Sequence, residues 1–173
     1  ALVGSTFVGG SGQDGLNTFL AYNYADQGRG EVILGEDGSV YVASCTQSND
    51  FPATNNSVFP IYMGGSQDAC VFKLNPDLSS LEWSSFLGGT NSDAAYSLKL
   101  SNDNTLFICG GTRSSNFPAT ADVHQGSFSG GTHDGFITKI SSDGQGFLAS
   151  TFLGTDGYDQ SYFVELDEEQ NVY

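Results

Sequence analysis

The chain repeats itself every 66 residues, and this spacing constrains its fold more than any other feature. The segment SNDFPAT at 48–54 recurs as SSNFPAT at 114–120, and FLG at 86–88 recurs at 152–154. The same spacing relates further residues without a gap from position 37 onward: Asp68 and Asp134, Lys73 and Lys139, Asp93 and Asp159, Tyr96 and Tyr162. A repeat of this length is typical of architectures in which each unit buries its core against its neighbours.

A partial earlier copy precedes these units. STFVGG at 5–10 matches SSFLGG at 84–89 at a spacing of 79, and the excess of 13 residues predicts an insertion between about Leu16 and Gly28. We therefore expect about 2.4 repeats. They are one unit over 1–79 with its insertion near 16–28, a second over 80–145, and a partial third over 146–173.

Each unit contains four short apolar runs that predict β-strands. One set of four is LKL at 98–100, LFIC at 106–109, FITKI at 136–140 and FLASTFL at 147–153. An earlier copy of the fourth run predicts a strand from Leu2 to Val8. The 23 glycines suit many strands joined by tight turns, and no window shows sustained helical periodicity.

Four antiparallel strands per repeat predict an all-β fold made of β-propeller blades. A closed propeller takes about 4 to 8 blades, so we expect this chain to be a fragment of a larger closed propeller.

Charge and hydropathy exclude two classes of partner. Five basic residues stand against 20 acidic ones, for a net charge of −15. Nucleic-acid binding requires clustered Lys and Arg, so we expect no nucleic-acid partner. No apolar run approaches the roughly 18 residues that span a bilayer, so we expect no membrane insertion.

Five motifs together resemble the seven-bladed β-propeller repeat family, abbreviated SBBP. They are STFLG at 150–154, DGSVYV at 37–42, NDFPAT at 49–54, GGSQDA at 64–69 and VFKLNPD at 71–77. The resemblance implies a non-catalytic module of a large secreted or cell-surface bacterial protein. Many such proteins resemble cargo of the type IX secretion system.

We accordingly expect an extracellular scaffold that binds other protein domains or glycans, with no catalytic residues and no cofactor. Two alternatives stay open. One is part of a carbohydrate-active propeller enzyme whose catalytic residues lie mostly outside this chain, and the other is a calcium-dependent adhesion module.

One acidic residue recurs in each glycine-rich turn, which raises the possibility of calcium. The candidates are Asp14, Asp68, Asp93, Asp134 and Asp159. Calcium takes 6 to 8 oxygen ligands, and one carboxylate per loop under-supplies that shell. The favoured interpretation is therefore that each Asp accepts hydrogen bonds from backbone N–H groups of its own turn.

The insertion holds the candidate partner-binding residues Phe19, Tyr22 and Tyr24. Aromatic side chains on such a loop suit a protein or glycan contact. The alternative is that they fold onto the neighbouring blade as local core.

The remaining candidates are cysteines and histidines. Cys45 and Cys70 lie at facing ends of predicted neighbouring strands, so a disulfide is possible, with Cys109 left free. The alternative is that all three are buried thiols. His124 and His133 lack metal-ligand spacing and are expected at the surface.

Overall fold

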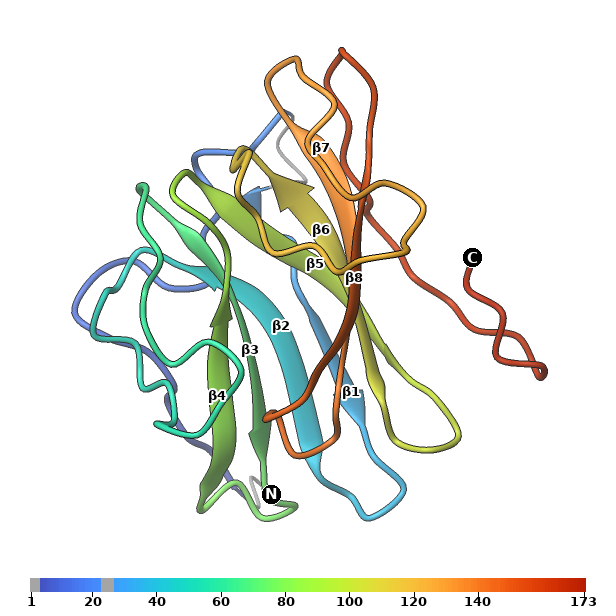
Figure 1. Ribbon diagram of the computed structural model, residues 1–173. Helices are drawn as coiled ribbons and strands as arrows, with labels where there is room; N and C mark the ends of the chain where they lie inside the picture. The colour runs from blue at the N-terminus through green and yellow to red at the C-terminus, as the bar shows by residue number, and fades with distance from the viewer. Residues whose placement is uncertain (1–3, 23–26) are drawn as a thin grey trace.

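The computed structural model describes residues 4–22 and 27–173 as an all-β fold. Eight strands form two four-stranded antiparallel sheets, and in each sheet the strand order follows the chain (Figure 1). Sheet A contains β1 (Glu31–Leu34), β2 (Val40–Thr46), β3 (Asp68–Leu74) and β4 (Leu81–Leu87). Sheet B contains β5 (Asp93–Leu100), β6 (Leu106–Thr112), β7 (Asp134–Ile140) and β8 (Phe147–Leu153).

The first hairpin of each sheet is closed by the same turn chemistry. In sheet A, Asp37 accepts a hydrogen bond from the Ser39 N–H at 2.9 Å, and Gly38 adopts a φ of 81°. In sheet B, Asp103 accepts from the N–H of the residue two positions on, and Asn104 adopts a φ of 59°. Gly and Asn tolerate this left-handed conformation, so two different sequences give one turn.

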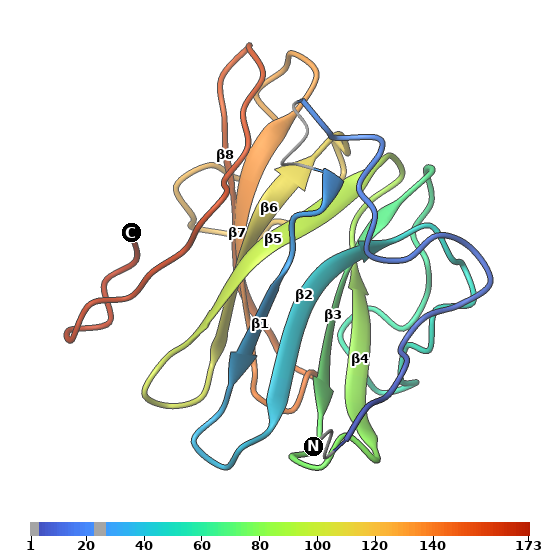
Figure 2. The same ribbon diagram turned by 180° about the vertical axis from the view of Figure 1, so that it is seen from behind.

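The largest core cluster lies between the two sheets, which pack face to face with β5 against sheet A (Figure 2). Alternate residues of each strand face this seam, as the strand period of two requires. Sheet A contributes Tyr41, Ala43, Ala69, Val71, Trp83 and Leu87, and sheet B contributes Ala95, Leu98, Leu106, Ile108, Phe136, Ile140 and Phe152.

Backbone contacts recur with the repeat spacing. The N–H of Asp93 donates to the Gln67 carbonyl at 2.8 Å, and the N–H of Asp159, 66 residues later, donates to the His133 carbonyl at 3.0 Å. Residues after β8 therefore lie against sheet B as the start of β5 lies against sheet A.

The same correspondence extends to the side chains on the outer face of sheet B. Val164 packs against Phe107 and Cys109 there. The equivalent residue Leu98 belongs to the seam cluster with Tyr41.

The eight strands of the two complete units match the sequence prediction. The predicted strand from Leu2 to Val8 is wrong over residues 4–8, which form no strand, and residues 1–3 lie outside the described part of the chain. After β8, only an isolated bridge pairs Leu166 with Val172, although Glu165 and Tyr173 exchange two backbone hydrogen bonds of 2.9 Å. No helix in residues 4–22 or 27–173 has the length and apolarity to cross a membrane.

Candidate functional site

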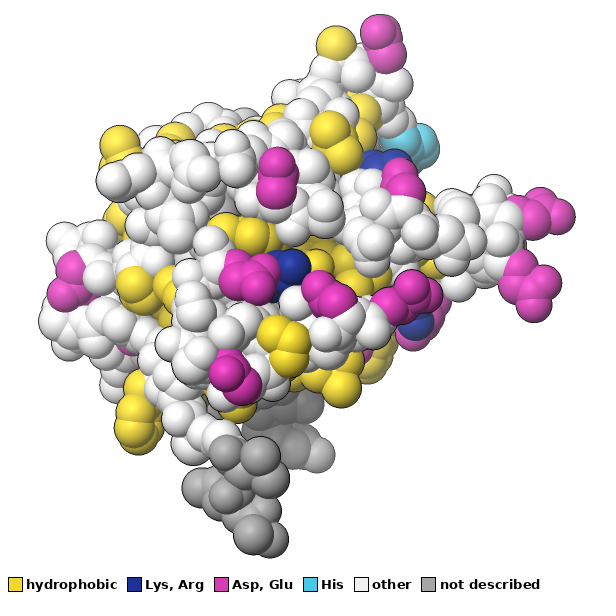
Figure 3. All heavy atoms as spheres, turned by 90° about the horizontal axis from the view of Figure 1, so that it is seen from below, with side chains coloured by type: hydrophobic (Ala, Val, Ile, Leu, Met, Phe, Trp, Pro, Cys, Tyr) yellow, Lys and Arg dark blue, Asp and Glu magenta, His cyan; other side chains and the backbone are white. Residues whose placement is uncertain are grey.

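A cavity of about 570 Å³ opens between the two sheets at the end where the hairpin turns meet. Figure 3 views the molecule from below and shows acidic side chains gathered near a lysine or arginine on this face. The lining comes from three turns and one face of sheet A: Glu36, Asp37, Tyr41, Lys73, Glu82, Trp83, Asn104, Ser142, Asp143 and Gln145.

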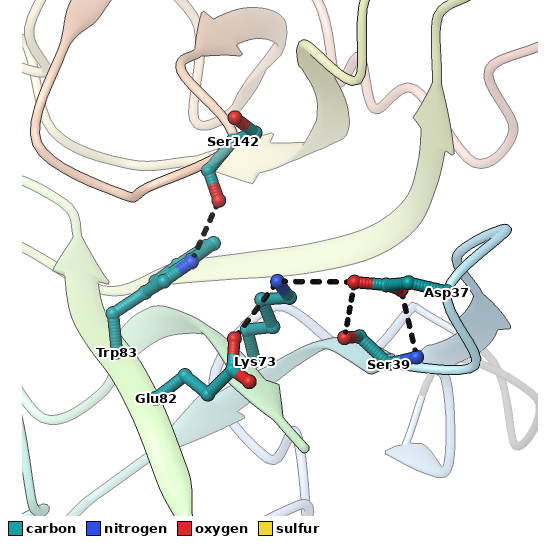
Figure 4. Close-up of polar contacts among 6 residues, drawn as sticks. All are labelled: Asp37, Ser39, Lys73, Glu82, Trp83 and Ser142. Atoms are coloured by element: carbon teal, nitrogen blue, oxygen red, sulfur yellow. Dashed lines mark hydrogen bonds and ion pairs between the residues drawn. The ribbon is translucent and has the colours of Figure 1, made fainter. Parts of the chain in front are cut away.

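Lys73 of β3 forms the charged floor of this cavity. Its Nζ lies 2.8 Å from Glu82 Oε2 and 3.8 Å from Asp37 Oδ2, and 5.3 Å from the centroid of the Tyr41 ring. Burial lowers the pKa of Lys73, but hydrogen bonds to Glu82 and Tyr41 outweigh this, so its pKa is raised on balance. Hydrogen bonds from the Ser39 N–H and hydroxyl lower the pKa of Asp37. These groups therefore form a fixed ionic triad (Figure 4).

Trp83 of β4 ties the two walls of the cavity together. Its Nε1–H donates to the Ser142 carbonyl on the β7–β8 turn at 2.9 Å, across the seam between the sheets (Figure 4). Gly144 of the same turn has a φ of 70°, and a Cβ built on it would collide with the Trp83 ring. The turn can approach the indole this closely because glycine has no side chain.

The cavity presents mainly negative charge and hydrogen-bond acceptors. Four carboxylates face one lysine, and Lys73 is already paired with two of them. The Tyr41 and Trp83 side chains are only 3% and 5% exposed, so neither ring offers an open face for stacking on a sugar. The cavity therefore suits a ligand with hydrogen-bond donors or positive charge, such as a basic side chain.

The second unit keeps part of this arrangement and loses the rest. Lys139 lies over the Phe107 ring at 5.0 Å, as Lys73 lies over Tyr41. Leu148 and Ala149 stand where the first unit has Glu82 and Trp83. Here the outer face of sheet B has a hollow of about 170 Å³. Its lining is Phe107, Val123, His124, Ile137, Lys139, Ala149, Ser150 and Thr151.

Three of the calcium candidates accept hydrogen bonds within their own turns. Asp14 accepts from the Gly10 N–H at 2.8 Å, Asp93 from the Gly89 N–H at 2.7 Å, and Asp159 from the N–H and hydroxyl of Thr155 at 2.7 Å each. This is the turn-stabilising role favoured above.

The other two candidates lie at the starts of their strands. Asp68 accepts from the Met63 N–H at 2.8 Å, and Asp134 accepts from the Ser129 N–H at 2.7 Å. Within the described ranges, no group of three or more His, Cys, Asp or Glu side chains is arranged to hold a metal ion. Calcium binding stays a prediction without a formed site.

The insertion contributes both core and surface. Leu20 is buried against Cys45 and Tyr96, and its carbonyl accepts from the Tyr158 hydroxyl at 2.8 Å. Tyr22 is 74% exposed, although its ring centroid lies 4.6 Å from that of Tyr158. Phe19 is 39% exposed, and Tyr24 lies outside the described residues. The insertion thus binds the first unit to the segment after β8.

The cysteines are free and buried. Ser44 stands opposite Cys70, and Cys45 stands opposite Ala69. The one-residue offset sends the Cys45 and Cys70 side chains to opposite faces of sheet A, so the possible disulfide does not form. Burial raises the pKa of Cys45 to about 12.

The two histidines differ. His124 is exposed, as expected, but the surface prediction for His133 is wrong. Its side chain is 8% exposed, with its ring centroid 4.3 Å from that of Tyr158. Burial lowers the pKa of His133 to about 4. The residues after β8 cover it, and no local pattern reveals such a contact.

Sequence reasoning missed the cavity residues Lys73, Glu82 and Trp83 as a site. The only signal was a lysine at the same position of both units, in a strand of otherwise apolar residues. It also missed Asn17, which is fully buried and whose side-chain oxygen accepts a hydrogen bond from Gln67 Nε2 at 2.8 Å.

Comparison with known proteins gives no relative: no family model matches the chain, and no curated protein matches it.

Proposed function

We propose that the chain is a non-catalytic interaction module whose repeats stack as blades of a β-propeller and bind another protein. The observation that supports this is the outer face of sheet B. Ile137, Ala149 and Leu153 are half-buried there, whereas the equivalent residues Val71, Trp83 and Leu87 are buried between the sheets. A face that is covered in one unit and partly open in the next is suited to a further sheet of the same type.

The proposed occupant of this face is a four-stranded unit of the same repeat. In the seam, Leu98, Ile108 and Phe136 of sheet B supply the apolar surface that covers sheet A. A unit with apolar residues at those positions would cover the hollow around Phe107 and Ala149 in the same way. A module of this kind belongs in a secreted or cell-surface bacterial protein, as the resemblance to the SBBP repeat implies.

A protein partner is favoured over a glycan. The aromatic rings of the acidic cavity are buried, so the stacking surface that sugars use is absent from its described lining. The net charge of −15 further favours a partner with a basic surface.

Self-association of the chain tests the proposed face. A second copy of the chain carries a four-stranded unit of the kind that we propose covers this face. We expect sedimentation velocity to show concentration-dependent association of the chain, and Ala149→Glu to weaken it at least about tenfold by burying an unpaired charge. Ala121→Glu is the matched control, since Ala121 is exposed on a loop. A chain that stays monomeric at every concentration and binds no hydrophobic dye would refute the docking face.

A further inference from the structure

Two buried carboxyl groups meet where sheet A joins sheet B. Asp68 begins β3 of sheet A, Asp93 begins β5 of sheet B, and both are 0% exposed. A Cβ built on Gly88 would lie 2.7 Å from Asp68 Oδ1 and 2.8 Å from Asp93 Oδ2. Both carboxyl groups therefore lie against Gly88, and a side chain at this position would collide with them.

The hydrogen-bond donors around this pair are unevenly shared. Asp93 accepts from the Gly89 N–H at 2.7 Å, from the Ser114 hydroxyl at 2.9 Å and from the Thr112 hydroxyl. Asp68 accepts at Oδ2 from the Met63 N–H, but its buried Oδ1 has no hydrogen-bond partner among the described residues. A buried carboxylate oxygen without a donor is costly, and a proton on that oxygen removes the cost.

No cation on the described residues balances the pair. The ion pairs found there join Lys73 to Asp37 and Glu82, and Lys99 to Glu165. The titratable groups that face Asp68 and Asp93 are the Tyr62 phenol and the Cys70 thiol. The pKa of each is raised, so both are uncharged at neutral pH and neither supplies positive charge.

The arrangement occurs again one repeat later. Asp134 begins β7, is 0% exposed, and has a buried Oδ1 with no hydrogen-bond partner among the described residues. A Cβ on Gly154 would collide with this carboxyl group. Asp159, in the segment that follows sheet B, raises the pKa of Asp134. A buried carboxyl oxygen without a hydrogen-bond partner therefore recurs at the same position of the next repeat.

We propose that Asp68, which lies beside Asp93 where the two sheets join, is a proton-binding site that retains one proton at neutral pH and loosens the junction when that proton is lost. Asp134 forms the second such site. The inference concerns the junctions between units and holds whatever partner the module binds.

The direction of the pH effect follows from burial. Burial raises the pKa of Asp68 to about 8 and of Asp93 to about 7, and their mutual repulsion adds to the rise for Asp68. A carboxyl with a folded pKa above its unfolded value of about 3.9 binds more protons when folded. The contribution of these two groups to the free energy of unfolding is therefore fully present near pH 4 and is lost as the pH rises toward 8. Two interacting groups titrate as a pair, so the measured transition belongs to both.

The test compares the chain with Asp68→Asn over pH 6 to 9. We expect the Tm of the unchanged chain to fall by at least about 5 °C over this range. The variant's amide has no proton to lose in this range, so its Tm should fall less and exceed that of the unchanged chain at pH 9. Asp77→Asn is the matched control, because Asp77 lies exposed on the β3–β4 turn and accepts its hydrogen bonds from Ser79.

Three results would overturn the proposal. One is a loss of Tm in Asp68→Asn that is equal at every pH, which indicates a structural role alone. Another is a rise in the Tm of the unchanged chain at pH 8 on adding calcium chloride, absent in the variant, which indicates a cation site. If the variant does not fold, carboxyl carbon NMR of the unchanged chain decides: titration of Asp68 below pH 5 excludes a retained proton, and titration above pH 6 supports it.

Discussion

Removing one phenyl ring from the seam between the sheets should cost a large part of the stability of this chain. Phe136 is 0% exposed, belongs to the inter-sheet cluster, and stacks on Phe117 with 4.3 Å between ring centroids. Truncation of a buried Phe to Ala costs about 3–5 kcal/mol. Hydrogen-bonded strands surround this site and cannot collapse into the space, so Phe136→Ala should lie in the upper half, near about 4 kcal/mol.

Equilibrium urea unfolding measures this effect directly. A loss of about 4 kcal/mol corresponds to a fall in Tm of roughly 8–16 °C for a chain of this size. The slope of the unfolding free energy against urea should stay unchanged, because the folded surface is the same. Phe7→Ala is the matched control: Phe7 is fully exposed, and its truncation should change stability by less than about 0.5 kcal/mol. A cost below about 1 kcal/mol for Phe136→Ala would show that the ring is not packed between two sheets.

Three further outcomes are expected. Trp83→Phe removes the hydrogen bond to the Ser142 carbonyl and should cost about 1 kcal/mol in urea unfolding; no effect would mean that the bond does not form. Gly144→Ala forces a left-handed φ on a residue with a side chain and presses a Cβ onto the Trp83 ring. It should cost more than about 1 kcal/mol by the same assay, whereas Gly126→Ala, with open space around its Cβ, should be nearly neutral. The three buried cysteines should react with a thiol reagent at pH 8 only when the chain is unfolded; rapid reaction of the folded chain would contradict their burial.

The sequence determined the local structure. The repeat spacing located all eight strands, because each unit has the same alternation of apolar residues and the same turn residues at the same places. It also placed the carboxylates of the glycine-rich turns, since a short polar side chain next to backbone N–H groups finds its partner locally. The function remains a proposal, because the sites proposed here depend on contacts between units.

Only the tertiary structure decided which faces meet. The acidic cavity combines turns from both sheets around Lys73, and no local pattern shows that Trp83 reaches the β7–β8 turn. The register between β2 and β3 put Cys45 and Cys70 on opposite faces of sheet A, a difference of one residue that spacing alone does not resolve. The packing of sheet B on sheet A brought both Asp68 and Asp93 against Gly88. Such contacts join residues far apart in the sequence, so they depend on how whole sheets pack and not on the short-range periodicity that a sequence displays.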